Sequence, residues 1–247
     1  MAINLQKGQT IDLRKSDRGD SYDLTTLTIG LGWDVRKKGF LSKLMGDKEE
    51  EYDLDAIALL LDSNGKVINR GEEKIWNNQY KSALFKSDVI YFNNVTFPSG
   101  TGTAKMVYPK DQFKSQIHQK VQDLLINGET IVHTGDNLTG EGEGDDEQII
   151  VKLDSLPERI QKIVFLACIY RGKTKNQHFG MIDNAFVRAV DAKGKEIARY
   201  SLSGNAFNGM CSMVFAEAYR KDASWKLRAL GEPHHTDNFV DILKLYI

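Results

Sequence analysis

The sequence predicts an all-β fold: a two-sheet β-sandwich with an internal pseudo-two-fold repeat and one inserted amphipathic helix. Three features predict this fold. Short apolar runs rich in β-branched residues lie between turn signals, two of these runs repeat one another, and one segment has its apolar residues at helical spacing. With 247 residues, of which 41% are hydrophobic, the chain can bury a sizeable core. We expect a single domain over residues 1–247, because repeated units in a sandwich share one core.

Eight segments have the composition of strands. They lie at residues 24–31, 56–62, 89–92, 148–153, 162–170, 185–190, 213–218 and 225–230. Two sequences between apolar runs, Asp62-Ser-Asn-Gly65 and Asp191-Ala-Lys-Gly194, are typical of tight turns in which glycine takes a positive φ. We expect each of these turns to close a hairpin.

The two turns belong to an internal repeat. Residues 55–70 align with residues 184–199 through the identities Ala56/Ala185, Asp62/Asp191, Gly65/Gly194, Lys66/Lys195, Ile68/Ile197 and Arg70/Arg199. Residues 131–135 match the pattern of 226–231 at a shorter offset, which implies an insertion at about residues 94–129. Two packed sheets related by a pseudo-two-fold would accommodate such a duplication.

The insertion at 94–129 contains the predicted helix. Its apolar residues Phe113, Ile117, Val121 and Leu124 recur at helical spacing, and Gly128 follows as a stop signal. We expect a helix over about 109–127 that packs on the sandwich, and docking of a partner is the alternative. A second insertion, at about 37–51, carries mixed charge around Phe40-Leu-Ser-Lys-Leu44 and indicates a surface excursion.

Composition excludes several classes of protein. The net charge of −1 provides no basic surplus for nucleic acid or for anionic lipid. The start of the chain has no apolar h-region and no run approaches 18 apolar residues, so neither a secretion signal nor a transmembrane segment is expected. Cys168 and Cys211 each fall in an apolar run without a CxxC partner, which favours buried thiols in a reducing cytoplasm.

An acidic, glycine-rich run is the main functional signal. Between His133 and Gln148 there are no lysines or arginines, and the carboxylates are Asp136, Glu141, Glu143, Asp145, Asp146 and Glu147. Crowded like charges are unfavourable unless a cation lies between them, and Ca²⁺ takes six to eight oxygen ligands of this kind. The alternative is a solvated acidic loop. The spacing differs from an EF-hand, because Leu138 and Gly140 occupy two of the positions that require oxygen side chains.

Further ligands must therefore come from other segments. Asp34 follows Gly30-Leu-Gly-Trp33 at the end of a predicted strand, and Asp53 and Asp55 lie two residues apart at the start of another, on one face. Singly, each is explained as a turn former or a surface charge. Together with the acidic run, they predict a cation site where the loops of the sandwich meet.

These segments resemble the signature sequences of the TerD family of tellurite-resistance and general stress proteins. The resemblance rests on Gly30-Leu-Gly-Trp-Asp-Val35, Tyr52-Asp-Leu-Asp-Ala-Ile-Ala58, the run from His133 to Gly142 with Gly144-Asp-Asp-Glu147, and Phe179-Gly-Met-Ile-Asp-Asn-Ala-Phe186. It covers the chain from about residue 5 to beyond residue 225. It implies a β-sandwich that binds Ca²⁺ through acidic loops, a cytoplasmic location with peripheral association at the inner membrane, and other Ter-family proteins as partners.

The resemblance also implies a set of Ca²⁺ ligands. Matching residues give Asp34, Asp53, Asp55, Asp136, Asn137, Glu141, Asp145 and Asp146, with Asn93 and Asn184 as second-rank candidates. Asn184 is the repeat counterpart of Asp55, so the second half of the chain carries a neutral amide where the first half carries a carboxylate. We expect the sites to cluster on loops of the first half.

The favoured function is a Ca²⁺-ordered interaction module rather than an enzyme. No GxSxG elbow, paired nucleophile or zinc spacing is present, and His133 is expected to be a satisfied strand histidine. Ala167-Cys-Ile-Tyr-Arg-Gly-Lys-Thr174 fits a relaxed phosphate-loop pattern, but a strand continues through it. The alternative function is a C2-like module that docks on anionic membrane through Ca²⁺ loops, with 37–44 as the basic or apolar tip. A metal-assisted hydrolase is a third reading, without an identifiable substrate.

Overall fold

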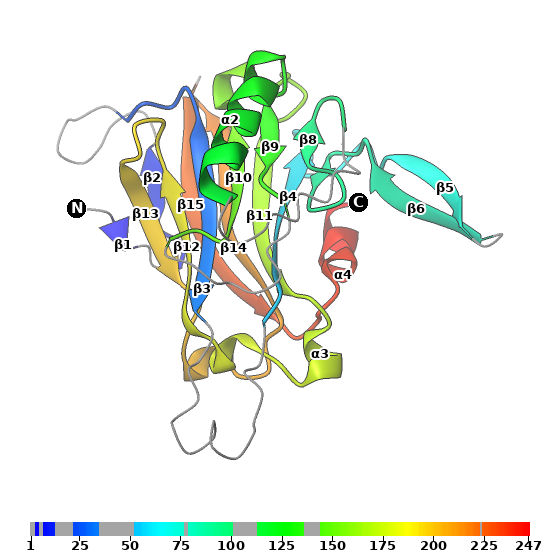
Figure 1. The fold of residues 1–247 in the computed structure, drawn as a ribbon, viewed down its shortest axis with the longest axis vertical. Coiled ribbons are helices and arrows are strands. Elements are labelled where there is room, and N and C mark those ends of the chain that lie inside the picture. Colours follow the sequence, from blue (N-terminus) through cyan, green and yellow to red (C-terminus); the bar gives the residue numbers. More distant parts are fainter. Residues whose placement is uncertain are drawn as a thin grey trace.

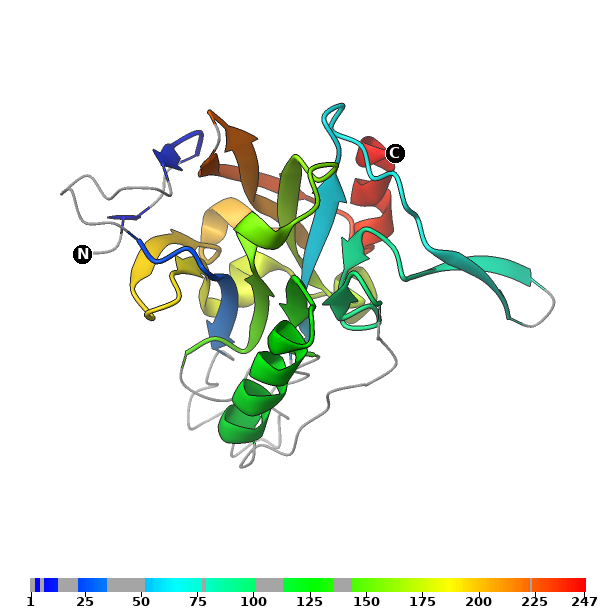
Figure 2. The same cartoon turned by 90° about the horizontal axis from the view of Figure 1, so that it is seen from above.

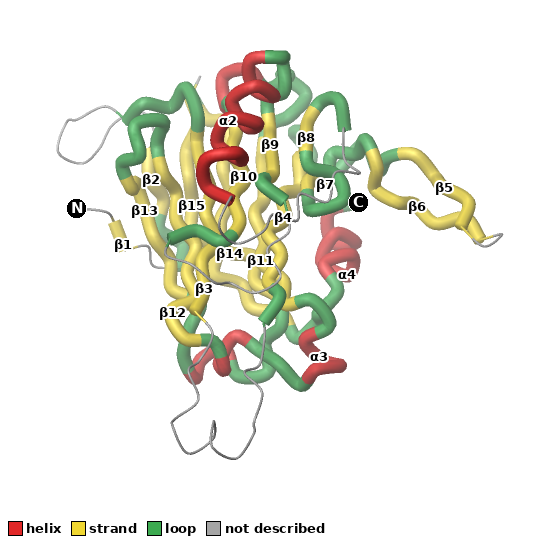
Figure 3. Tube along the Cα trace, viewed as in Figure 1, coloured by secondary structure: helices red, strands yellow, loops and turns green. Residues whose placement is uncertain are grey.

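The fold is that of a computed structural model, which describes residues 3–4, 7–12, 22–34, 52–76, 79–100, 113–135, 144–222 and 224–247. Within these residues, two mainly antiparallel sheets pack face to face as a β-sandwich (Figures 1 and 2). Strands dominate, and the helices lie at the periphery (Figure 3). The predicted all-β sandwich is confirmed.

The first sheet has seven strands. In spatial order they are β1 (Ile3–Asn4), β13 (Glu196–Ser201), β12 (Asp183–Val190), β3 (Leu27–Asp34), β10 (Glu147–Val151), β9 (Ile131–His133) and β8 (Thr96–Phe97). All neighbours are antiparallel except β1 and β13. Strand β3 is central, so residues at its end face the loops of both β10 and β12.

The second sheet has six strands. In spatial order they are β2 (Thr10–Asp12), β15 (Ser224–His234), β14 (Ser212–Lys221), β11 (Lys162–Ile169), β4 (Leu54–Leu61) and β7 (Val89–Ile90). A separate hairpin, β5 (Glu72–Trp76) with β6 (Gln79–Phe85), projects from the body (Figures 1 and 2). Each of the eight predicted strand segments overlaps an observed strand.

The core lies between the two sheets because alternate residues of each strand point inward. Leu27, Ile29, Leu31 and Trp33 of β3 are buried there. The rings of Phe165 in β11 and Phe215 in β14 stack in the same cluster, with centroids 6.0 Å apart.

Helices cover part of each outer face. Helix α2 (Phe113–Ile126) lies on the first sheet, where Val121 and Leu125 pack on Val132 of β9 and Ile150 of β10 (Figure 2). The predicted inserted helix and its packing are therefore confirmed. Helix α4 (Phe239–Leu243) packs on the second sheet through Ile242 and Leu243. The shorter helices are α3 (Gly172–Lys175), η1 (Leu153–Ser155), η2 (Phe179–Met181), η3 (Asn205–Phe207) and η4 (Lys244–Tyr246).

The two repeat turns have the same hydrogen bonds. Asp62 Oδ1 accepts the backbone N–H groups of residues 64 and 66 at 2.8 and 2.9 Å. Asp191 Oδ1 accepts those of residues 193 and 195 at 3.0 and 2.8 Å. Gly65 and Gly194 have φ values of 74° and 78°, which favour glycine. The repeat in the sequence thus encodes a repeated structure.

The first repeat turn does not close a hairpin, which corrects the prediction. Turn 191–194 connects β12 to β13, but no strand follows turn 62–65 until β5. The Val67 N–H instead donates to the Tyr246 carbonyl at 2.7 Å, and β7 occupies the edge beside β4. The chain therefore leaves the sheet after the turn.

The remaining predictions from apolar residues agree with the structure. Cys168 and Cys211 are free and buried, and burial raises the pKa of the Cys168 thiol to about 12. Trp33 and Trp225 are buried in the core, while the side chain of Trp76 and the predicted insertion at 37–51 lie outside the described parts. No helix within the described ranges is long and apolar enough to cross a membrane.

Candidate cation site at one end of the sandwich

Three segments that are distant in sequence meet at one end of the sandwich. The backbone N–H of Trp33, near the end of β3, donates to Asp146 Oδ2 at 2.9 Å. The Trp33 indole N–H donates to the carbonyl of Tyr52, just before β4, at 3.0 Å. Trp33 therefore links the start of β10 to the start of β4. The backbone of Asp34 follows directly in β3, but its side chain is outside the described part.

A second set of contacts joins the two sheets at the same end. Glu147 Oε2 accepts the Ala56 N–H at 2.7 Å, and the Ala56 carbonyl lies 2.9 Å from His133 Nε2. The Gly135 N–H donates to His133 Nδ1 at 2.9 Å, so His133 Nε2 must carry the proton and donate to Ala56. His133 is thus a satisfied strand histidine, as predicted, and Gly135 places the start of the acidic run beside β4.

Several carboxylates in this region are buried. Asp55 is 6% exposed, Asp146 is 5% exposed and Glu147 is fully buried. Burying carboxylates is unfavourable unless hydrogen bonds or cations compensate. Backbone N–H groups supply part of this compensation for Asp146 and Glu147. Glu147 was not among the predicted ligands, although its place in the acidic run could have drawn attention to it.

The structure brings some of the predicted ligands together. Asp53, Asp55 and Asp146 lie at this end, with the backbone of Asp34, but Asp55 shares the outer face of β4 with Ile57 and Leu59 and therefore points away from the first sheet. The second-rank candidate Asn184 lies there too, because its neighbour Asp183 pairs with Asp34. Asn93 is exposed in the turn between β7 and β8. Asp136, Asn137 and Glu141 lie outside the described residues.

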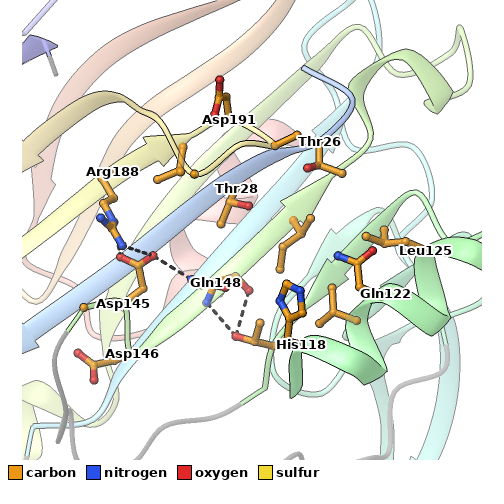
Figure 4. Close-up of a pocket in the computed structure, with 17 residues that line it drawn as sticks. Thr26, Thr28, His118, Gln122, Leu125, Asp145, Asp146, Gln148, Arg188 and Asp191 are labelled. Carbon is orange, nitrogen blue, oxygen red and sulfur yellow. Dashed lines mark hydrogen bonds and ion pairs between the residues drawn. The ribbon is translucent and has the colours of Figure 1, made fainter. Parts of the chain in front are cut away.

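Asp145 has a different environment from the other predicted ligands. Its carboxylate accepts two hydrogen bonds from the Arg188 guanidinium, at 2.7 Å from Nε and 3.1 Å from Nη2 (Figure 4). Gln148 Nε2 donates to the same carboxylate at 2.9 Å. The ion pair with Asp145 is the main reason that the pKa of Arg188 is raised. A Ca²⁺ ion would have to compete with Arg188 for this carboxylate.

Two glycines of β3 make room for this arrangement. A Cβ on Gly30 would lie 2.2 Å from the Asp145 carboxyl carbon, and a Cβ on Gly32 would lie 2.5 Å from the Gly144 carbonyl oxygen and from the Phe186 ring. Residues 30 and 32 both face outward, because Ile29, Leu31 and Trp33 face the core. Because residues 30 and 32 are glycines, no side chain projects from the outer face of β3 there. The Asp145 carboxylate can therefore lie directly against the backbone of β3.

A cavity of about 540 Å³ lies above this surface, between α2 and the turn from β12 to β13 (Figure 4). Asp145, Arg188 and Gln148 form one wall, and His118, Gln122 and Leu125 of α2 form another. The lining combines hydroxyl, amide, charged and apolar groups. This mixture does not specify one class of ligand.

The described residues do not form a metal site by themselves. Within the described ranges, no group of three or more histidine, cysteine, aspartate or glutamate side chains could hold a metal ion. The donors fit Ca²⁺ in their chemistry, since the acidic residues at this end provide oxygen ligands for a hard cation. The other ligands that the sequence predicts, in the acidic run and at Asp34, lie outside the described residues.

Because His133 is buried, its titration makes the stability of the fold depend on pH. Desolvation lowers its pKa from 6.5 to about 4, so at neutral pH the nearby Glu147 carboxylate, at 3.6 Å, faces a neutral ring. As pH falls below 6.5, the unfolded chain takes up a proton that the folded chain does not. Stability is therefore complete above that pH and declines until the folded pKa is reached.

We expect the free energy of unfolding to fall by about 2 kcal/mol through His133 alone between pH 7.5 and pH 5. Urea denaturation at both pH values measures the difference. In His133→Gln, which retains a terminal N–H donor but does not titrate, the decrease should be smaller by this amount. An equal decrease in both proteins would contradict the assignment.

The fold and this end of the molecule together define a β-sandwich that collects acidic residues from both sheets at one end. Comparison with known proteins agrees with this class: the TerD domain model matches residues 1–112 and 122–246. The chain belongs to the TerD family, as its sequence motifs predicted. The two matched segments are consistent with the internal repeat.

Relatives match over the whole chain. The tellurium resistance protein TerX of Serratia marcescens is 45% identical, and stress response protein SCP2 of Bacillus subtilis (strain 168) is 37% identical, each with 100% of both chains covered. The crystal structure of a TerD homologue, SCO6318 from Streptomyces coelicolor A3(2), has a TM-score of 0.55 at 16% identity. It covers 90% of this chain and 98% of that one, and it supports the fold alone.

Proposed function

We propose that this protein is a Ca²⁺-binding interaction module of the tellurium-resistance and general stress response, and that it acts without catalysis. Membership of the TerD family supports a role in this response. The convergence of β3, β4 and β10 at one end, with Asp146 and Glu147 buried there, supports the cation. We further propose that it works in the cytoplasm, with other Ter-family proteins as partners.

The residues of this end suggest what the cation does. Asp53 and Asp55 precede or begin β4, while Asp146 and Glu147 lie at the start of β10 in the other sheet. A divalent cation held between these segments would reduce the repulsion among their carboxylates. Partners could then recognise the surface in its cation-bound form.

Calorimetric titration of chelator-treated protein with Ca²⁺ and with Mg²⁺ tests the proposal. We expect Ca²⁺ to bind and to raise the melting temperature. Saturation at about 100 times the Kd should stabilise the fold by roughly 2.7 kcal/mol. Mg²⁺ should bind more weakly, because it requires a small octahedral site and keeps several waters.

Matched variants identify the site. Asp55→Asn and Asp146→Asn should each weaken Ca²⁺ binding at least tenfold, which is a loss of about 1.4 kcal/mol. Asp154→Asn is the control, because Asp154 is exposed and lies beyond the opposite end of β10. No binding heat and no thermal shift in the wild-type protein would reject the Ca²⁺ proposal. Equal affinity in all three variants would reject this location.

A further inference from the structure

The cavity between α2 and the turn from β12 to β13 has the outer face of the first sheet as its floor. Thr28 of β3 and Ile150 of β10 lie on this floor, and Thr26 precedes Thr28 on the same side of the chain (Figure 4). The volume of about 540 Å³ is in the range of sites that bind small molecules. The composition of the lining selects no ligand, but the hydrogen bonds of its polar groups restrict the choice.

The carboxylates of the lining are buried and already bonded. The Asp145 side chain is 1% exposed and is bound by Arg188 and Gln148. Asp146 and Asp191 are 5% and 4% exposed. A backbone N–H of β3 donates to Asp146, and three backbone N–H groups donate to Asp191. A cationic ligand therefore finds no accessible carboxylate among these three.

Arg188 also has its donors in use. Its Nε and Nη2 groups donate to Asp145, and Nη1 lies 3.3 Å from Glu196. The described lining combines this single arginine with three aspartates, so negative charge is in excess there. An anionic ligand is therefore repelled, and it finds no guanidinium group that is not already paired.

Other polar side chains of the lining have hydrogen-bonding groups that the protein does not use. Among the residues that the structure describes, the hydroxyls of Thr26 and Thr28 find no hydrogen-bond partner, and neither does the amide of Gln122 or the imidazole of His118. A purely apolar ligand would cover these groups and leave them without water, which costs free energy. A ligand that fits must therefore bring donors and acceptors of its own.

We infer that this cavity binds a neutral sugar. A sugar hydroxyl donates and accepts at the same time, as the threonine hydroxyls do, and it also suits both ends of a glutamine amide. The C–H faces of a sugar ring can pack on the apolar part of the lining, which includes Val121, Ile150 and Val190. A planar aromatic ligand fits less well, because the described lining has no Phe, Tyr or Trp on which it could stack. This site is separate from the proposed Ca²⁺ function and does not depend on it.

Saturation-transfer NMR of the full chain, followed by titration, tests the inference. The probes are glucose, galactose, mannose and N-acetylglucosamine, with inorganic phosphate and putrescine as competing anion and cation. We expect at least one of these sugars to bind, with a Kd of about 1 mM because so small a ligand makes few contacts. Neither phosphate nor putrescine should displace it.

Removal of the two unused hydroxyls locates the binding. Thr26→Val/Thr28→Val keeps the shape of both side chains and breaks no hydrogen bond of the protein, so its melting temperature should not fall. The Kd for the sugar should rise about 25-fold, roughly fivefold for each lost hydrogen bond. Thr28→Phe, which places a ring in the cavity, should abolish binding. Thr10→Val is the matched control and should bind as the wild-type protein does, because Thr10 is exposed in β2 of the other sheet.

Titrations in Ca²⁺ and in chelator distinguish this site from the proposed cation site. Binding that depends on the two threonines should occur in both conditions. Sugar binding that needs Ca²⁺ and is equal in the wild-type protein and the double valine variant would place the sugar on the cation and overturn the inference. Absence of binding by all four sugars, or displacement of the sugar by putrescine or phosphate, would overturn it as well. If Ca²⁺ does not bind while the threonine-dependent sugar binding persists, the proposed Ca²⁺ function fails and the sugar site stands.

Discussion

Replacing Arg188 by methionine should destabilise the protein by about 3 kcal/mol, because the substitution leaves the Asp145 carboxylate buried without its cation. The Asp145 side chain is 1% exposed, and the Arg188 side chain is 27% exposed. The guanidinium donates one hydrogen bond to each carboxylate oxygen, a geometry that lysine cannot reproduce. Arg188 Nη1 also lies 3.3 Å from Glu196, which in turn binds Arg199. The substitution therefore disturbs a network on the outer face of the first sheet.

Urea denaturation measures this loss, and the melting temperature should fall by about 6–12 °C for a chain of this size. Lys244→Met is the matched control, because Lys244 pairs with Asp241 at 2.8 Å but both side chains are largely exposed. Solvent screens that pair, so little change is expected. Arg188→Met/Asp145→Asn should recover part of the lost stability, since no uncompensated charge stays buried. A small effect of Arg188→Met would mean that Asp145 finds another cation, such as bound Ca²⁺.

The β-sandwich could be predicted because local patterns in the sequence indicate its strands. The β4 segment Leu54–Leu61 is almost entirely apolar, and all eight residues are buried. The Asp-x-x-Gly turns carry their own hydrogen bonds and repeat with identical spacing. In contrast, the projecting β5–β6 hairpin begins Glu-Glu-Lys, a charged sequence without a strand-like apolar alternation. This sequence therefore does not predict a strand.

The candidate site was predictable only in part, because composition does not show which acidic residues have partners. Asp145 and Asp146 are neighbours in the same acidic run. In the structure, Asp145 is held by Arg188 while Asp146 accepts the N–H of Trp33. Arg188 reaches Asp145 because both Arg188 of β12 and Gln148 of β10 pair with Gly30 of β3. That register follows from sheet topology, which no local pattern in the chain reveals.

Gly30→Ala should destabilise the fold by about 3 kcal/mol, since it adds a methyl group where the Asp145 carboxylate lies. The new Cβ would be within 2.2–2.5 Å of three atoms of that carboxylate. Overpacking of this kind typically costs about 1–3 kcal/mol, and moving the carboxylate would also break its bonds to Arg188. Gly30 has no positive φ, so the backbone itself does not oppose alanine.

A double-mutant cycle shows whether Asp145 is the cause. In an Asp145→Ala background, the same Gly30→Ala substitution no longer meets a carboxylate, and its effect on the free energy of unfolding should fall below about 1 kcal/mol. An interaction energy near zero would show that another contact opposes the methyl group. A large interaction energy would instead show that the contact with Asp145 alone requires a glycine at position 30 of the family motif. Its role is to leave room for the Asp145–Arg188 pair on the outer face of β3.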